Sequence, residues 1–391
     1  MKSKINLIYA LFLLTILVRC SSSSTLYEKN ELRREGNATF KDKITIKHAK
    51  GFSITYHKNY KVLKIISPFE KQADTATYLL IPRGNARPAG YPESQLIEIP
   101  VRSLVAMSSM HIGLIGFLEA EDVLTGLSNF QYVSSERVQN RIKAGRIKEV
   151  GKDQGLNEEL LITMQPDLVM ATGSPVSKMD RFNGLKAAKI PILVNSEWVE
   201  TTPLARAEWV KLMGALLNKE DEVNRRFEKI EKEYNRLAAI GANAATKPSV
   251  ITGMNSRDAW FVPNGNSYVC KFLKDAGASY YWEKTKATGS LPLNFEAVYP
   301  VALGADFWLN VSISNVKTTQ DLLAKDTRYA DFKAFKTGKV YGYHQRTNQQ
   351  GANDYWESGA VNPQDVLADL IKILHPELLP DHELIYYKQL K

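Results

Sequence analysis

Aromatic and cationic side chains collect where predicted strands end. Trp198 follows the apolar run "PILVNS", and Tyr355 and Trp356 are adjacent in the polar loop "GANDYWESG". Aromatic faces can cover the rings of a large, flat, partly apolar chelate, while arginine satisfies its peripheral carboxylates or amides. For each tryptophan, packing in the core is the alternative explanation. The expected ligand contacts are Met107, Trp198, Arg257, Trp260, Arg346, Tyr355 and Trp356.

Histidines near the same strand ends raise the question of a bound metal ion. The chain has six histidines, of which only His111 and His344 lie near predicted strand ends. Zinc and manganese carriers need several histidine and carboxylate ligands that converge on one point. We therefore expect no directly bound metal and no cofactor. The alternative is that His111 or His344 is a single axial ligand to the metal of a bound chelate.

Sequence motifs for covalent or hydrolytic chemistry do not occur in the chain. There is no G-x-S-x-G elbow, Walker loop, G-x-G-x-x-G after a strand, H-E-x-x-H or C-x-x-C. We therefore expect that the protein is not an enzyme and that its function is binding without chemistry.

The first twenty residues have the pattern of an export signal. Lys2 and Lys4 precede the apolar run "INLIYALFLLTILV", and Cys20 and four serines follow it. The run is short for a membrane span. A cysteine directly after such a run predicts a lipoprotein signal, in which Cys20 becomes the lipidated residue. A plain signal peptide with an incidental cysteine is the alternative.

Length and composition indicate a globular chain of about two ordinary domains. The 391 residues are 44% apolar and 24% charged. The net charge is +9, but lysines and arginines are scattered among acids, so we expect no nucleic-acid partner. Cys270 is left without an intramolecular disulfide partner.

The hydrophobic pattern predicts an α/β fold: two three-layer α/β lobes joined by a long interdomain helix, with a small N-terminal β-rich extension. Alternating residues broken by Gly and Pro predict short strands before residue 100. Beyond it, apolar runs such as "SLVAMS" and "PDLVMAT" alternate with helix-length segments, as in buried parallel sheets. The expected boundaries are 1–20 signal peptide, 21–43 tether, 44–100 extension, 101–203 amino-terminal lobe, 204–240 interdomain helix and 241–391 carboxyl-terminal lobe. Gly214 could divide the long helix in two.

Two similar phrases occur, one in each predicted lobe. "NEELLITMQPDLVMAT" begins at Asn157 and "NFEAVYPVALGADFWLN" begins at Asn294, and each has a glutamate two residues later, Glu159 and Glu296. Asn is a preferred N-cap, and an acid in the first helical turn interacts favourably with the helix dipole. That local explanation is sufficient for either phrase alone. The repetition predicts two carboxylates at corresponding places, which could dock a symmetric partner with basic groups.

Residues 95–391 resemble an ABC-transporter substrate-binding protein of the helical-backbone class, which handles vitamin B12 and ferric siderophores. The resemblance is carried, in order, by "SLVAMSSMHIGLIGFLEAEDVLTGLS", "PDLVMAT", "PILVNSEWVETTPLARAEWVKLMGALLN", "DAWFVPNGNSYVCKFLKDAGA", "LNFEAVYPVALGADFWLN" and "NPQDVLADLIKILHPELLPDHELIYYKQL".

This resemblance implies a ligand held in the cleft between the lobes and passed to a membrane permease. It also implies that Glu159 and Glu296 dock against permease arginines. We therefore expect a monomeric, lipid-anchored protein on the periplasmic side of a bacterial membrane that captures a ferric siderophore or cobalamin. One alternative is a Zn/Mn or haem binding protein of the same architecture. Another, of a different class, is a surface lipoprotein that acts as an interaction module, for which the extension could serve.

Overall fold

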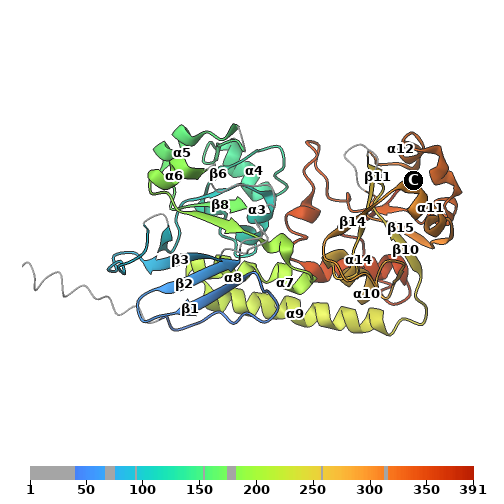
Figure 1. The fold of residues 1–391 in the computed structure, drawn as a ribbon, viewed down its shortest axis with the longest axis horizontal. Coiled ribbons are helices and arrows are strands. Elements are labelled where there is room, and N and C mark those ends of the chain that lie inside the picture. Colours follow the sequence, from blue (N-terminus) through green and yellow to red (C-terminus); the bar gives the residue numbers. More distant parts are fainter. Residues whose placement is uncertain are drawn as a thin grey trace, which may run out of the picture.

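The structure is a computed structural model that describes residues 40–66, 75–92, 95–152, 155–173, 182–256, 259–311 and 316–391. The predicted signal peptide with Cys20 lies outside the described residues, as does Arg257. The described chain forms two α/β lobes side by side, and helix α9 (Glu220–Ala242) runs along one side of both (Figure 1). This confirms the predicted fold class. Among the described helices, none combines the length and the apolar character that a bilayer crossing requires.

A five-stranded parallel sheet forms the centre of the amino-terminal lobe. Its order is β7 (Lys148–Glu149), β6 (Leu124–Leu127), β5 (Leu104–Ala106), β8 (Leu168–Thr172) and β9 (Ile192–Asn195). Along β8, Leu168 and Met170 pack into one core cluster, and Val169 and Ala171 pack into another on the opposite face. Burial on both faces explains why this strand reads as a continuous apolar run. The helices of this lobe are α3 (Ser109–Gly116), α4 (Glu136–Lys143), α5 (Glu158–Met164) and α6 (Asn183–Ala187).

The carboxyl-terminal lobe has a smaller parallel sheet of order β13 (Ser279–Tyr280), β10 (Ser249–Thr252) and β15 (Phe307–Leu309). Beside it lie the pair β16 (Tyr341–Gly342) and β17 (Lys388–Gln389), and an antiparallel sheet of β11 (Asn255–Ser256), β12 (Ala259–Pro263) and β14 (Ser290–Leu293). The helices are α10 (Tyr268–Asp275), α11 (Phe295–Gly304), α12 (Thr319–Leu323), α13 (Lys333–Lys336) and α14 (Pro363–Leu374).

The two similar phrases fold into the same local structure. Asn157 caps α5 by accepting the Leu160 N–H at 2.9 Å, and Asn294 caps α11 by accepting the Ala297 N–H at 2.9 Å. Each helix leads to an aspartate and then to a strand that pairs in parallel with the first strand of its lobe.

The two aspartates also make matching contacts. Asp167 accepts the N–H of Ser103 at 3.2 Å, and its own N–H donates to the Ser103 hydroxyl at 2.9 Å. Asp306 makes the same two contacts with Ser249, at 2.8 and 3.0 Å. The lobes are therefore related down to individual hydrogen bonds.

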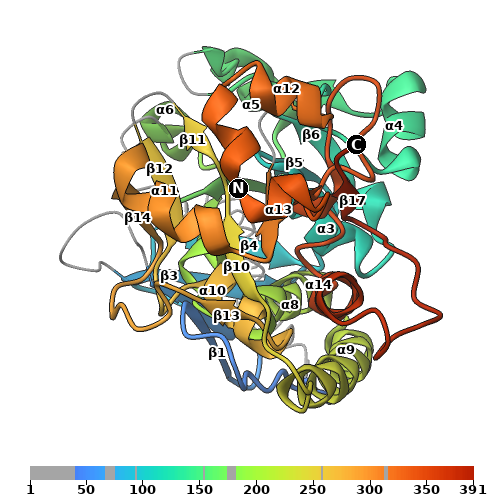
Figure 2. The same ribbon diagram turned by 90° about the vertical axis from the view of Figure 1, so that its right-hand side faces the viewer.

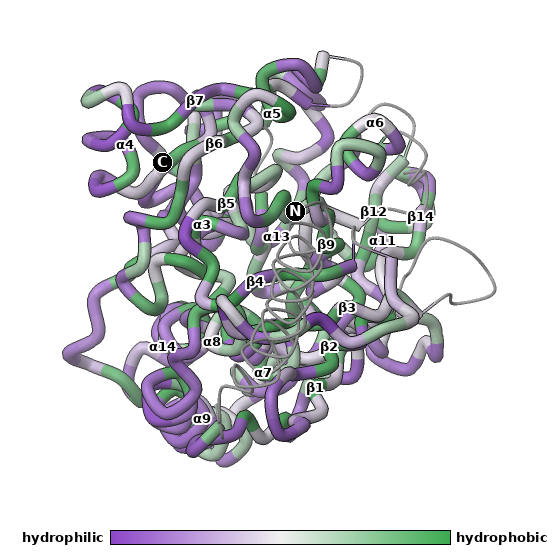
Figure 3. Tube along the Cα trace, turned by 90° about the vertical axis from the view of Figure 1, so that its left-hand side faces the viewer, coloured by the Kyte–Doolittle hydropathy of each residue, from purple (hydrophilic) through white to green (hydrophobic). Residues whose placement is uncertain are grey.

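The predicted helical stretch between the lobes is three helices: α7 (Pro203–Ala207), α8 (Val210–Leu217) and α9. Asn218 ends α8 in the left-handed conformation, with φ 54°. The apolar stripe of α9 is buried at Val223, Phe227, Ile230, Tyr234 and Leu237. Its remaining surface is mainly hydrophilic (Figure 3). Helix α9 packs against α8 of the first lobe and against α10 and α14 of the second (Figure 2). One rod thus supports both lobes.

Strands β1 (Phe52–Tyr56), β2 (Lys61–Ile66), β3 (Thr75–Pro82) and β4 (Leu96–Ile99) form a separate sheet, antiparallel except for the β3–β4 pair. The segment that leads into this sheet is bound to the helical connection by buried carboxylates. Glu208 accepts the backbone N–H groups of Lys47 and Ala49 at 2.9 and 2.8 Å, and Glu200 accepts that of Gly51 at 2.8 Å. The extension therefore shares its core with the rest of the chain.

Candidate ligand-binding site between the lobes

A pocket of about 400 Å³ lies at the carboxyl ends of β5, β8 and β9, where ligands gather in parallel α/β sheets. The amino-terminal lobe and α7 supply most of its lining, and the short helical turn η7 (Asp354–Trp356) supplies the rest from the other lobe. The lining residues are Ser108, Ser109, Met110, Thr172, Gly173, Glu197, Trp198, Arg206 and Trp356. The chain that follows β16, orange-red in Figure 1, lies between the lobes.

Two exposed indoles from opposite lobes define this pocket. Trp198, in the turn after β9, is 37% exposed, and Trp356 is 43% exposed. Both were expected ligand contacts, and both lie in the lining. An indole offers a large flat apolar surface, so a pair of them suits a ligand with ring systems or apolar arms.

The floor of the pocket is a buried ion pair. Arg206 of α7 donates from Nη2 to Oε1 of Glu197 at 3.4 Å, and Glu197 is only 4% exposed. The Arg206 guanidinium also lies 5.0 Å from the ring centre of Tyr268. Burial raises the pKa of the Glu197 carboxyl, while the Arg206 charge opposes that shift. The buried floor of the pocket thus contains the N–H donors of Arg206 and the carboxylate acceptor of Glu197, and the exposed indoles of Trp198 and Trp356 form an apolar rim above it.

Arg206 was not among the expected contacts because the sequence pattern placed it in the interdomain helix. The sequence feature that could have identified Arg206 as a pocket residue is a single cation in the apolar run "PLARA", close to a predicted strand end. Thr202 caps α7 and Pro203 begins it, so the helix starts beside the pocket and directs Arg206 toward Glu197.

Trp260, another expected ligand contact, does not line the pocket. The side chain is 0% exposed, and its Nε1–H donates to the Thr252 carbonyl at 2.9 Å. Its ring packs among Phe295, Trp308 and other aromatics of the lobe core. The chain turns back at β11–β12, so Trp260 faces its own lobe rather than the cleft.

The other expected contacts lie around the pocket rather than in it. Tyr355 is buried and stacks on Tyr343, with ring centres 4.5 Å apart, so it supports its neighbour Trp356. Met107 is half-buried against the core beneath the sheet. Arg346 pairs with Asp354 at 3.0 Å and lines a different cavity of about 570 Å³. None of these three residues lines the pocket.

Neither candidate axial histidine is in the pocket lining. His111 is fully buried in α3, and burial lowers the pKa of its imidazole to about 3, which makes the ring neutral. Burial also lowers the pKa of His344. Within the described part of the chain, no three His, Cys, Asp or Glu side chains are grouped closely enough to hold a metal ion.

Glu159 and Glu296 occupy matching positions at the surface. Each lies in the first turn of its helix, α5 or α11, and each is exposed. Helix α5 leads directly into the parallel strand β8 and α11 into β15, so each helix begins at the carboxyl edge of its sheet, where ligands gather. Ile162 and Leu303 are exposed on the same two helices. They follow the glutamates by three and seven residues, which places each on the glutamate's face of its helix.

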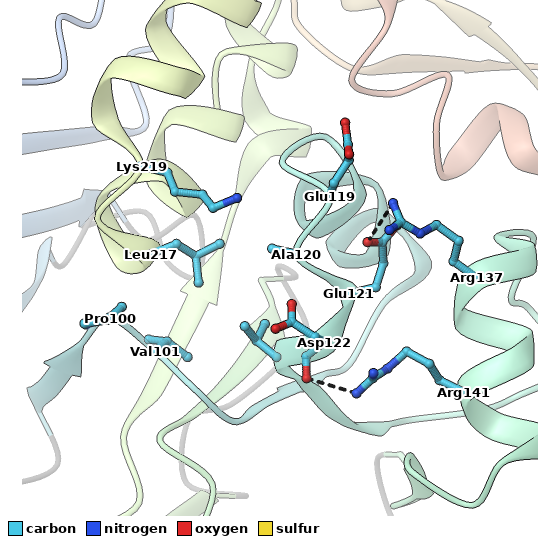
Figure 4. A pocket seen from close by; sticks show the side chains of 11 residues that line it. Pro100, Val101, Glu119, Ala120, Glu121, Asp122, Arg137, Arg141, Leu217 and Lys219 are labelled. Atoms are coloured by element: carbon cyan, nitrogen blue, oxygen red, sulfur yellow. Dashed lines mark hydrogen bonds and ion pairs between the residues drawn. The ribbon is translucent and has the colours of Figure 1, made fainter.

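A larger cavity, about 670 Å³, lies on the flank of the amino-terminal lobe (Figure 4). Pro100, Val101 and Val123 line it, and they precede β5 and β6, so it opens at the amino ends of these strands. Its lining contains both acidic and basic side chains, and the Arg137 guanidinium forms an ion pair with the Glu121 carboxylate at 3.5 Å (Figure 4). The site that topology favours for a ligand is the pocket at the opposite edge.

Comparison with known proteins identifies the family. The profile of the periplasmic binding proteins matches residues 104–347, which is more than half of the chain. The chain belongs to the periplasmic binding protein family. The extension before residue 101 is outside the match.

Individual relatives of this periplasmic binding protein agree with the assignment. An uncharacterized lipoprotein of Methanocaldococcus jannaschii is 28% identical over 291 residues, 72% of this chain and 67% of the relative. The crystal structure of Helicobacter pylori CeuE in a Ni-His complex has TM-score 0.55 and 17% identity, covering 82% of this chain and 90% of that one. A periplasmic heme binding protein from Pseudomonas aeruginosa has TM-score 0.54 and 15% identity, covering 74% and 98%. At these identities the two structures show a shared fold.

Proposed function

We propose that this periplasmic binding protein captures a metal chelate, a ferric siderophore or cobalamin, between its lobes and delivers it to an ABC permease. The observation that carries the proposal is the pair of exposed indoles, Trp198 and Trp356, which flank the Arg206–Glu197 floor from opposite lobes. A ligand that touches both indoles bridges the lobes, so ligand binding favours one relative position of the two lobes. No bond of the ligand changes in this mechanism.

The pocket chemistry favours a chelate. Two indoles and an arginine fit organic ring systems and peripheral polar groups, which a chelator provides around its metal. Two structural neighbours are named for metal-containing ligands, Ni-His and heme. Haem is the second candidate, because the heme binding neighbour shares the fold and flat porphyrin faces would also fit between indoles.

Permease docking is proposed for the two helix starts. Glu159 with Ile162, and Glu296 with Leu303, each present an acid beside an exposed aliphatic side chain. An acid–aliphatic patch on each lobe would pair with two basic, partly apolar patches on a symmetric permease. Lipidation at Cys20 would hold the protein on the periplasmic side of the membrane, as a monomer.

Ligand retention tests the proposal. The purified full-length protein is incubated separately with cyanocobalamin, haem, ferric citrate and a ferric catecholate, passed through a desalting column, and assayed for bound cobalt and iron. We expect one chelate class to be retained at about one metal per chain. Retention of none of them contradicts the proposal.

A further inference from the structure

Several buried polar atoms around the pocket floor have no hydrogen-bond partner among the described residues. Glu197 Oε2, Arg206 Nε and Thr172 Oγ1 belong to side chains that line the pocket. Asn195 Nδ2 and Ser196 Oγ, in the two residues before Glu197, are also unpaired. A buried polar atom without a partner destabilises the folded protein, so such a cluster marks a place where a ligand can supply the missing bonds.

The unpaired atoms define what the ligand must offer. The N–H at Arg206 Nε requires an acceptor on the ligand, whereas the Oε2 of Glu197 requires a donor. The Thr172 hydroxyl can serve as either. One ligand group must therefore contain a donor and an acceptor close together.

The charges of Arg206 and Glu197 further limit which ligand group can bind at the pocket floor. Arg206 and Glu197 already neutralise each other at the floor, 3.4 Å apart. A carboxylate would accept from Arg206 but would face the Glu197 carboxylate with no hydrogen to donate, and two like charges in a buried site repel. A carboxamide has a carbonyl oxygen for Arg206 and an N–H for Glu197, and it has no net charge.

We infer that the floor formed by Glu197 and Arg206 recognises a neutral carboxamide of the bound chelate and discriminates against a carboxylate at the same place. The inference rests on the proposed function, since it names the chemistry of the ligand in that pocket. It favours an amide-bearing chelate such as a corrinoid over a chelate that presents free carboxylates. Donation to Oε2 also stabilises the ionised Glu197, which burial disfavours.

The wild-type protein gives the first test, which does not depend on any variant. Cyanocobalamin is compared by tryptophan-fluorescence titration with its three isomeric monocarboxylic acids, each of which has one peripheral carboxamide hydrolysed. We expect at least one monoacid to bind about tenfold more weakly than the parent. Equal or tighter binding of all three monoacids overturns the inference.

The Glu197→Gln variant gives the second test. Removing the carboxylate leaves the Arg206 charge unpaired, so it can bind a carboxylate on the ligand. The monoacid that binds the wild type more weakly than cyanocobalamin should therefore gain about tenfold in affinity relative to cyanocobalamin. The matched control is Trp198→Phe, which alters the pocket rim without changing its charge and should weaken both ligands alike. An unchanged affinity ratio in Glu197→Gln contradicts the inference.

The two proposals fail in different ways. If ferric citrate binds and cyanocobalamin does not, the carboxamide inference is wrong but a chelate carrier remains. If none of the chelates binds, the proposed function itself is wrong and the inference falls with it.

Discussion

Glu357 of the carboxyl-terminal lobe and Ser135 of the amino-terminal lobe form a hydrogen bond across the interlobe boundary, with the Ser135 N–H 2.8 Å from Oε1. The Ser134 N–H donates to Oε2 of the same carboxylate at 2.8 Å. Ser135 caps α4, so Glu357 lies at the positive end of that helix. Gly113 of α3 permits the approach, because a Cβ there would lie 2.2 Å from the Glu357 carbonyl oxygen. This contact holds Trp356 beside the pocket.

Glu357 should make stability depend on pH. Burial raises the pKa of this carboxyl from 4.5 to about 7, with Asp354 contributing in the same direction. The folded state therefore binds more protons than the unfolded state between these values, so stability falls as the pH rises through that window. Between pH 5 and pH 8 the loss should be about 2 kcal/mol.

Urea unfolding at several pH values checks this prediction. In Glu357→Gln the ionisable group is gone, so this part of the pH dependence should disappear, although one of the two bonds to the α4 terminus is lost. Glu222→Gln, on the surface of α9, is the matched control and should keep the wild-type slope. Parallel pH profiles for wild type and Glu357→Gln would show that the carboxyl does not titrate in this range.

Lys61 should be essential for stability although it lies in the extension. Its side chain is fully buried, and Nζ pairs with Glu220 at the start of α9 while donating to the Ala215 carbonyl at 2.7 Å. Burial lowers the pKa of Lys61, and Glu220 opposes that shift. In Lys61→Met the volume is roughly kept, but the buried Glu220 carboxylate loses its cationic partner and retains the Tyr56 hydroxyl at 3.4 Å. We expect a loss of about 3 kcal/mol in the free energy of unfolding.

The control for Lys61 is its neighbour on the same strand. Lys64 is exposed on β2, so Lys64→Met should change stability by less than about 0.5 kcal/mol in the same urea titration. Similar values for the two variants would mean that the extension is not coupled to α9 through this pair.

Charge reversal at the two helix starts should separate docking from binding. Glu159→Lys and Glu296→Lys together should reduce uptake of the bound chelate by proteoliposomes containing the permease by about tenfold or more, because each lobe then repels a basic patch. The dissociation constant of the purified protein for the chelate should not change, since neither residue lines the pocket. Glu228→Lys, on the exposed side of α9, is the control and should transport normally. Loss of ligand affinity in the double variant would argue against a docking role.

The helix N-caps of the repeated phrase and the alternation of strands and helices could both be predicted from the sequence. Asn157 and Asn294 were readable as N-caps because capping depends on local chain geometry, and both caps are present. The alternation of buried strands and helices was equally readable, because strand burial on two faces leaves a continuous apolar run.

The side chains of the pocket were harder to predict because tertiary packing decides them. Trp198 and Trp260 both follow predicted strand ends, yet one is exposed in the pocket and the other is enclosed by Trp308 and Phe295. Arg206 reaches the pocket only because α7 begins beside Glu197, nine residues earlier in the chain. Such a contact depends on where two short helical turns meet, which residue periodicity does not specify.

If a chelate is held between Trp198 and Trp356, the double variant Trp198→Ala/Trp356→Ala, which lacks both indoles, should bind it weakly. The chelate retained by the wild-type protein is titrated into both proteins, and heat of binding is measured by calorimetry. Tyr281→Ala, which removes an exposed aromatic that is not in the pocket lining, is the control and should bind as wild type does. We expect the affinity for the chelate to fall by about a hundredfold in the double variant. Wild-type affinity in the double variant would contradict it.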